Sequence, residues 1–337
     1  MTNLDPSNMR GMIQNFPNQF ALGFKWSNHL QLPTTITNII VTGMGGSALP
    51  TDLINSIFAN QLPHPITVNR SYTLPSNQLT NTTLVIACSF SGNTEETISA
   101  YHQALSANCP LVVIAGGGQL IELAKEHDVP FVQLHKESPN FQPRMGSGYF
   151  FAALTNILIA INWLKPETKS DIITQAQTLL GNEEEGIQLA NQLKNSVPVF
   201  YSSDPYWSVA RIAKIKFNEN AKVPAFFNVL PEANHNEMVG YTTPNTTYTP
   251  IFLIDPQEDP RINQRFAVMQ QVLANQSQIQ SHSYQMTGDT LFQKTFNTLI
   301  LLDWASYHLA LLNGIDPTPV AMVEDFKSLI KPSQVVS

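Results

Sequence analysis

Short apolar runs alternate with longer segments of mixed polarity along most of the chain. In the first half the apolar runs occupy 36–41, 65–68, 84–87, 111–115 and 131–134. Runs of this density are typical of strands that are buried on both faces. The segments between several of them have helical spacing, and strands that alternate with helices predict βαβ units and a parallel sheet. We therefore predict an α/β domain for the first half.

The second half repeats this alternation. Apolar runs at 197–201, 251–254 and 279–284 predict strands, and 225–229 is either a short strand or a loop. Helical spacing covers 208–220, 261–274 and 291–312. The chain is therefore predicted to form two tandem, doubly wound α/β domains, each a parallel sheet flanked by helices. We place the first domain at 1–164 and the second at 165–337, with Lys165-Pro166 as the linker.

Several helices are expected outside these strand–helix units. Residues 1–30 predict one or two peripheral helices, and 317–330 predicts a loop followed by a final helix. The apolar segment 149–164 is interrupted by threonine and asparagine, so it predicts a buried helix rather than a membrane span. After Lys165-Pro166 we expect one exposed amphipathic helix that runs to about Leu193, with its acidic run in solvent.

Composition narrows the classes of function. A length of 337 residues suits two domains, and a net charge of −7 argues against broad nucleic-acid binding, which needs a basic surface. The two cysteines, Cys88 and Cys109, lie in or next to predicted strands and are expected to be reduced core residues. The N-terminus lacks a basic region followed by an apolar core. A cytoplasmic protein without membrane contact is therefore expected.

Two of the predicted strands end in small, polar loops. After 84–87 come Ser89, Ser91 and Thr94, and after 36–41 come Gly45, Gly46 and Ser47. Such loops present hydroxyls and backbone N–H groups next to a helix N-terminus, which favours binding of an anion such as phosphate. The alternative is an ordinary turn with capping hydroxyls. A nucleotide P-loop is disfavoured because the lysine is missing, and a nicotinamide site because no acidic residue ends the next strand.

Titratable residues concentrate between 214 and 238. Glu219 lies where a predicted helix ends, and His235 lies in a polar segment that begins with proline. Each also has an ordinary interpretation, since Glu219 could pair with a nearby lysine and His235 could be a histidine at a loop tip. The residues alone leave both readings open.

Five motifs in this order carry a family resemblance. They are Gly43-Met44-Gly45-Gly46-Ser47, Ser89-Phe90-Ser91-Gly92-Asn93-Thr94, Pro143-Arg144, Asn218-Glu219-Asn220-Ala221-Lys222-Val223-Pro224-Ala225 and Pro231-Glu232-Ala233-Asn234-His235-Asn236-Glu237. From about residue 36 to Lys327 the chain resembles the bifunctional phosphoglucose/phosphomannose isomerases, two-domain members of the sugar-isomerase (SIS) superfamily. The serine/threonine loop is shared by many SIS proteins, whereas the last two motifs are much more specific.

The resemblance implies a role for each site residue. Ser89, Ser91 and Thr94 would hold the phosphate of a sugar phosphate, in a pocket also lined by Gly45, Gly46 and Ser47. Glu219 would move a proton between C1 and C2 through a cis-enediol, and Arg144 would stabilise the negative charge of that intermediate. His235, from the neighbouring subunit of a homodimer, would assist ring opening, and Lys327 would lie near the ring oxygen.

These implied roles suit the chemistry of the side chains. Proton abstraction beside a carbonyl needs a positioned base and a cation where oxyanion charge develops, and ring opening suits a group that titrates near neutrality. No metal or other cofactor is expected, because the chain lacks H-x-x-x-H and C-x-x-C patterns.

Two other functions are alternatives to the isomerase. The first is a non-catalytic SIS sensor that binds a phosphosugar and regulates a partner. The second is the isomerase half of an amidotransferase, which would need an N-terminal cysteine and a glutaminase domain. The balance between glucose- and mannose-phosphate activity stays open, and the Thr318 hydroxyl is a candidate contributor to it.

Overall fold

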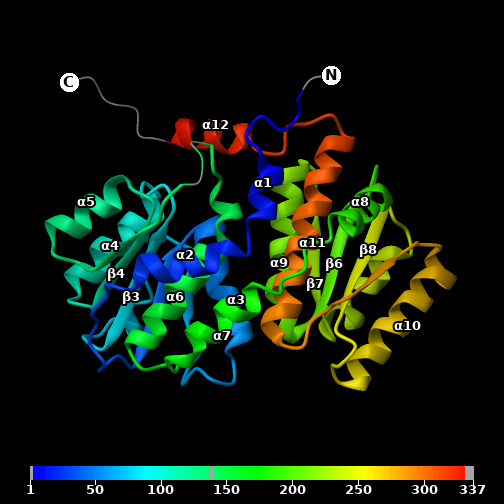
Figure 1. Ribbon diagram of the computed structural model, residues 1–337. Coiled ribbons are helices and arrows are strands. Elements are labelled where there is room, and N and C mark those ends of the chain that lie inside the picture. The colour runs from blue at the N-terminus through cyan, green and yellow to red at the C-terminus, as the bar shows by residue number, and fades with distance from the viewer. Residues whose placement is uncertain (1–2, 137, 139, 331–337) are drawn as a thin grey trace.

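A computed structural model describes residues 3–136, 138 and 140–330 (Figure 1). Its strands form two sheets in which every pairing is parallel, one of five strands from the first half and one of four from the second. Helices flank both sheets, so the predicted fold class is confirmed.

The first sheet has the strand order β2-β1-β3-β4-β5. Its strands are β1 (Asn38–Gly43), β2 (Thr67–Asn69), β3 (Thr83–Ser89), β4 (Leu111–Ala115) and β5 (Phe131–Gln133). One face packs against α4 (Glu95–Ser106) and α5 (Gly118–Glu126), and the other against α2 (Asn18–Ser27), α3 (Leu49–Ile57) and α6 (Ser147–Ala160). Because successive strand residues face opposite sides, Ile39 and Val41 join one core and Ile40 the other.

The second sheet has the order β7-β6-β8-β9. Its strands are β6 (Val197–Ser203), β7 (Phe226–Leu230), β8 (Tyr248–Ile254) and β9 (His282–Gln285). One face packs against α10 (Pro260–Ser277), and the other against α9 (Trp207–Lys216) and α11 (Leu291–Leu312). The segment that the sequence left undecided between strand and loop is the strand β7.

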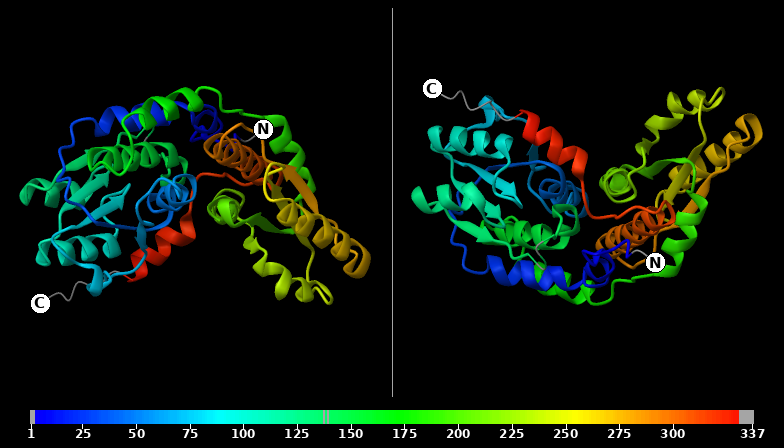
Figure 2. Two further views of the ribbon diagram at one scale, coloured as in Figure 1. Left: turned by 90° about the horizontal axis from the view of Figure 1, so that it is seen from below. Right: turned by 90° about the horizontal axis from the view of Figure 1, so that it is seen from above.

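One apolar core runs between the two sheets. Aromatic rings from α2, α6 and α11 meet there, with ring centroids 4.8 Å apart for Phe20 and Phe296 and 5.2 Å apart for Phe151 and Phe296. In Figure 2 the first helix, α1 (Met9–Gln14), lies beside α11. Burial of this shared apolar surface stabilises the contact between the two halves of the chain.

Two helix predictions need correction. The single amphipathic helix expected up to about Leu193 is two helices, α7 (Glu167–Ala176) and α8 (Glu183–Gln192). The chain breaks because the Asn182 side chain caps α8 by accepting from the Glu185 N–H at 3.3 Å. The helix expected over 208–220 is α-helical only to Lys216 and continues as one π-helical turn, Phe217–Ala221.

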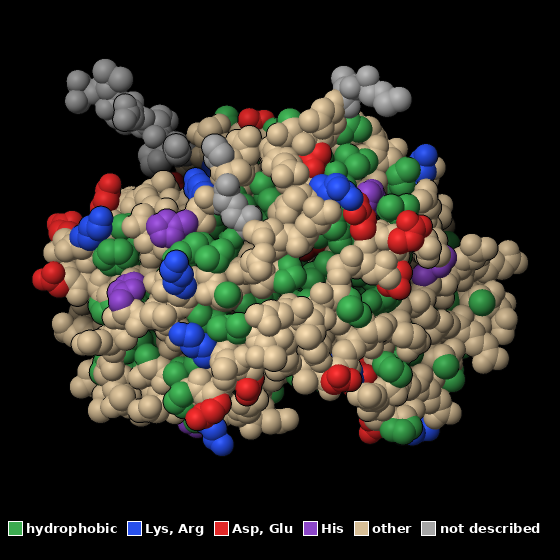
Figure 3. Space-filling model, in the orientation of Figure 1, with side chains coloured by type: hydrophobic (Ala, Val, Ile, Leu, Met, Phe, Trp, Pro, Cys, Tyr) green, Lys and Arg blue, Asp and Glu red, His purple; other side chains and the backbone are tan. Residues whose placement is uncertain are grey.

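The surface carries charges of both signs (Figure 3), and the two cysteines are buried as predicted. On the face drawn in Figure 3, charged side chains of both signs are scattered among neutral atoms. Cys88 and Cys109 are free and buried. Among the described residues, every helix is too short or too polar to span a bilayer.

Candidate active site

Three hydroxyls converge where β3 ends. The Ser89 hydroxyl lies 2.8 Å from that of Thr94 and 3.4 Å from that of Ser91, and it accepts from the Gly92 N–H at 3.1 Å. Thr94 immediately precedes α4, so the positive end of this helix faces the same loop. Ser89 is buried and Ser91 is exposed, so the cluster can be reached by a ligand from the side of Ser91. The sequence-predicted anion loop is thus assembled as a compact group of donors.

The glycine loop after β1 lies beside this cluster. β1 and β3 are neighbours, and the chain leaves them in opposite directions across the sheet, which is where ligands bind in such folds. The Ser47 hydroxyl accepts from the Phe90 N–H at 3.0 Å and so joins the two loops. Gly45 has a φ of +50°, which favours glycine. A Cβ at Gly46 would lie 2.6 Å from the backbone nitrogen of Arg144, so only glycine allows this approach.

Arg144 is the most heavily bonded residue of the region. It belongs to the 3₁₀ turn Pro143–Met145, and its side chain is 1% exposed. Nε donates to Asn220 Oδ1 at 2.6 Å, and Nη2 donates to the carbonyls of Pro317 and Thr318 at 2.9 and 2.8 Å. Nη1 donates to Glu219 Oε2 at 3.2 Å. Burial lowers the pKa of Arg144, and the Glu219 charge opposes this shift.

Glu219 lies in the π-helical turn after α9, a type of distortion that is frequent at functional sites. Its side chain is 32% exposed, so Glu219 contacts Arg144 and is also partly accessible from outside. The neighbouring Asn220 accepts from Arg144 and donates to Ser306 Oγ at 2.9 Å, which fixes the turn against α11. The structure therefore brings a carboxylate and a guanidinium together beside the glycine and hydroxyl loops.

Sequence reasoning missed the residues that support this pair. Lys216 is fully buried, forms an ion pair with Asp303 at 2.6 Å and donates to the backbone carbonyl of Arg144 at 2.6 Å. Lys222 donates to the carbonyls of Glu219 and Pro317. Burial, followed by the Arg144 charge, lowers the pKa of Lys222 to about 8. Lys222 belongs to the motif 218–225, whereas nothing in the spacing of the sequence links Lys216 to Asp303.

Two predicted site residues lie apart from this cluster. His235 is exposed in the 3₁₀ turn Glu232–His235, and within the described part of the chain its ring has no hydrogen bond or ion pair. Lys327 is exposed in α12 (Ala321–Ile330), where it pairs with Glu324 at 2.8 Å. The chain as described joins neither residue to Arg144 or Glu219 by a hydrogen bond or an ion pair.

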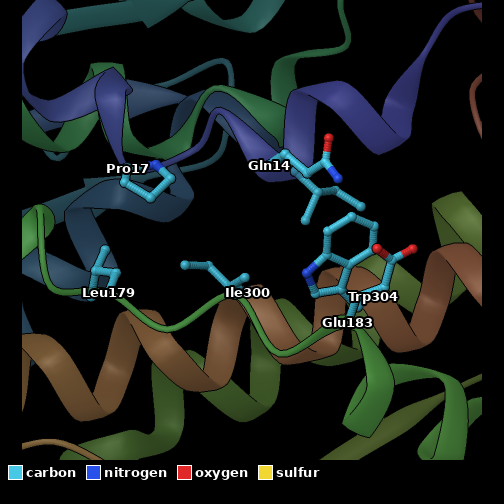
Figure 4. Close-up of a pocket in the computed structure, with 8 residues that line it drawn as sticks. Gln14, Pro17, Leu179, Glu183, Ile300 and Trp304 are labelled. Atoms are coloured by element: carbon cyan, nitrogen blue, oxygen red, sulfur yellow. The ribbon is translucent and has the colours of Figure 1, made fainter.

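A small cavity of about 190 Å³ lies elsewhere, between α1, α11 and the segment that joins α7 to α8. Figure 4 shows Gln14, Pro17, Leu179, Glu183, Ile300 and Trp304 around it. None of its lining residues belongs to the predicted site. Within 3–136, 138 and 140–330, no three His, Cys, Asp or Glu side chains are grouped to hold a metal ion.

Comparisons with known proteins bear on the family and the fold of the chain. A model of the bacterial phospho-glucose isomerase C-terminal SIS domain matches residues 182–330. A D-glucosamine-6-phosphate 4-epimerase of Sulfolobus acidocaldarius is 34% identical over 213 residues, which are 62% of this chain and 65% of that protein. The solved C-terminal domain of glucosamine-fructose-6-phosphate aminotransferase from Francisella tularensis has the same fold, with a TM-score of 0.72 at 15% identity, and the match covers 92% of this chain and 97% of that one.

A relative that matches over most of both chains determines the family. A bifunctional phosphoglucose/phosphomannose isomerase of Thermoplasma volcanium is 32% identical over 299 residues, which are 87% of this chain and 91% of the relative. The resemblance first found in the motifs is thereby confirmed. The chain belongs to the bifunctional phosphoglucose/phosphomannose isomerase family.

Proposed function

We propose that the protein is an aldose–ketose isomerase that interconverts glucose 6-phosphate or mannose 6-phosphate with fructose 6-phosphate. The observation that carries this proposal is the Arg144–Glu219 pair, 3.2 Å between Nη1 and Oε2, packed beside the glycine and hydroxyl loops. Phosphate and reacting carbons of one small sugar would thus have separate, adjacent binding groups. The buried free cysteines support a cytoplasmic setting for this activity.

In the proposed reaction Ser89, Ser91 and Thr94 bind the phosphate with the N-terminus of α4. The Glu219 carboxylate removes a proton from the carbon beside the carbonyl. The electrons of that C–H bond form the C1–C2 double bond of a cis-enediol, while the carbonyl oxygen gains negative charge and then a proton. Arg144 stabilises this oxygen. Glu219 then returns its proton to the other carbon, while the hydroxyl on the carbon that first lost its proton gives up its own proton and becomes the new carbonyl, so one proton leaves one oxygen for each proton taken up by the other.

His235 and Lys327 would complete the site during ring opening. We propose that His235 acts on the cleft of a second copy in a homodimer, and its exposure is compatible with that use. Lys327 would act near the ring oxygen, and its present partner Glu324 is a surface residue that it can exchange for substrate. No metal or other cofactor takes part in these steps.

The test is turnover of fructose 6-phosphate by the purified protein after incubation with EDTA, with both aldose products measured. We expect glucose 6-phosphate and mannose 6-phosphate to form, and to contain deuterium at C2 when the reaction runs in D2O, because the base is partly exposed. Tight binding without turnover would identify a phosphosugar sensor instead. C4 epimerisation of glucosamine 6-phosphate without aldose–ketose conversion would favour the activity named for the Sulfolobus relative.

Thr318 gives a prediction about the two products. Its hydroxyl is buried and, among the described residues, lacks a hydrogen-bond partner, while its carbonyl accepts from Arg144 at 2.8 Å. Thr318→Val removes only the hydroxyl. A net hydrogen bond contributes about 0.5–1.5 kcal/mol, so we expect one aldose product to fall about 2- to 10-fold relative to the other.

The measurement is the ratio of mannose 6-phosphate to glucose 6-phosphate formed from fructose 6-phosphate at early times. Thr295→Val is the matched control, because that hydroxyl is equally buried and partnerless among the described residues but lies in α11. An unchanged ratio in Thr318→Val would assign its hydroxyl no part in recognition at C2.

A further inference from the structure

The second specific motif contains a carboxylate that the proposed mechanism does not use. Glu237 follows His235 by two residues, in the 3₁₀ turn Glu237–Tyr241. Tyr201 Oη on β6 donates to Glu237 Oε1 at 2.5 Å, and Asn228 Nδ2 on β7 donates to Glu237 Oε2. Both carboxylate oxygens are therefore held, each by a different one of two neighbouring strands of the second sheet (Figure 1).

The donors are themselves fixed. Tyr201 is completely buried, stacks on Phe252 with a centroid separation of 5.3 Å, and lies 2.8 Å from the hydroxyl of Tyr241. Burial raises the pKa of both phenols, that of Tyr241 to about 12, so each keeps its proton near neutral pH. Hydrogen bonds from such donors to a carboxylate are roughly twice as strong as those between neutral groups. Glu237 is thus tied to the rigid part of the domain.

His235 depends on these contacts for its position. The turn that carries it is held on one side by Ala233, which is buried in the core, and on the other by Glu237. The His235 ring is exposed and makes no hydrogen bond within the described residues. The place of the ring therefore depends on how its turn is anchored, by Ala233, by Glu237 and by Asn234, whose Nδ2 lies 3.3 Å from Met269 Sδ on α10.

We propose that Glu237 is a positioning residue for His235, acting through its hydrogen bonds to Tyr201 and Asn228. The chemical part of this inference rests on the proposed function, in which His235 assists ring opening. The geometric part is independent of that function: the orientation of the histidine turn depends on the Glu237 carboxylate. A displacement of about 1 Å in a catalytic group is enough to lower a rate about a hundredfold.

The kinetic test compares Glu237→Gln and Tyr201→Phe with the control Tyr248→Phe. Tyr248 contacts the ring of Tyr241, yet its hydroxyl lies beside Asn245 rather than Glu237. We expect the first two variants to lower kcat about 10- to 100-fold with KM within twofold, because the phosphate loop belongs to the other sheet. The control should stay within twofold of wild type. If Glu237 acts through His235, adding Glu237→Gln to His235→Asn lowers kcat no further.

Full additivity in that double variant, or a wild-type kcat in both Glu237→Gln and Tyr201→Phe, would overturn the proposal. If Glu237→Gln fails to fold, Tyr201→Phe still tests the proposal, because it keeps the Glu237 carboxylate and removes only one of its hydrogen-bond donors.

A second readout separates this inference from the proposed function. The proton resonances of the His235 ring, assigned by their loss in His235→Asn, report the turn directly. We expect them to shift in Glu237→Gln and Tyr201→Phe and to stay in place in Tyr248→Phe. This holds even if the protein turns over no sugar phosphate, in which case the proposed function fails and the positioning role stands. Unmoved His235 resonances in both variants would refute the positioning role whatever the activity.

Discussion

Glu219→Gln is expected to lower kcat for isomerisation of fructose 6-phosphate by about 10²- to 10⁴-fold, the range that a positioned general base contributes. The amide keeps the size of the carboxyl, and its oxygen can still accept from Arg144, whose Nη1 lies 3.2 Å away. An amide does not accept a proton from carbon, so both directions of the reaction lose their base. The measurement is kcat and KM for each sugar phosphate, with fructose 6-phosphate binding followed by calorimetry.

Binding should change little in this variant, because the proposed phosphate contacts come from the loop after β3. Glu167→Gln is the matched control: it is the same substitution at an exposed carboxyl, in α7 and outside every motif of the proposed site. We expect the control to retain wild-type kcat. A Glu219→Gln enzyme with more than a tenth of wild-type activity would mean that another group removes the proton.

The sequence predicts the position of those site residues that follow directly from the order of strands and helices. Ser89 and Gly46 each follow a dense apolar run, and the carboxyl ends of neighbouring parallel strands meet at one edge of a sheet. Their convergence was therefore predictable without any relative. The pairing of Arg144 with Glu219 was not, because 75 residues separate them and each side chain alone allowed an ordinary interpretation. The family resemblance supplied that pair, and the geometry is compatible with it.

Two departures from the predicted helices have different origins. The start of α8 is marked locally, because Gly181-Asn182 supplies a turn and an N-cap that accepts from the Glu185 N–H, and the single-helix prediction overlooked this signal. The π-helical turn that presents Glu219 is set by tertiary contacts of Asn220 with Arg144 and Ser306. Only the π-helical turn shows tertiary packing that overrides a helical pattern in the sequence.

Lys216→Met is expected to lower the free energy of unfolding by about 3–5 kcal/mol, the typical cost of breaking a buried ion pair by removing one partner. The side chains of Lys216 and Asp303 are 2% and 3% exposed, and their charged atoms lie 2.6 Å apart. Without the ammonium, the Asp303 carboxylate is left without its counter-charge in the core between the two sheets. The backbone carbonyl of Arg144 also loses its donor, so the proposed active site should loosen with the fold. Urea denaturation followed by circular dichroism measures the loss.

A double variant separates the value of the pair from the penalty for an unpaired charge. Replacing both groups, as Lys216→Met with Asp303→Leu, should restore much of the stability, because an apolar pair of similar volume needs no desolvation of charge. Lys327→Met is the surface control for stability: its ion pair with Glu324 joins side chains that are 58% and 62% exposed, and its loss should cost less than about 1 kcal/mol. If Lys216→Met cost no more than Lys327→Met, the buried pair would not be what holds Arg144 and the Glu219 turn against each other across the two sheets.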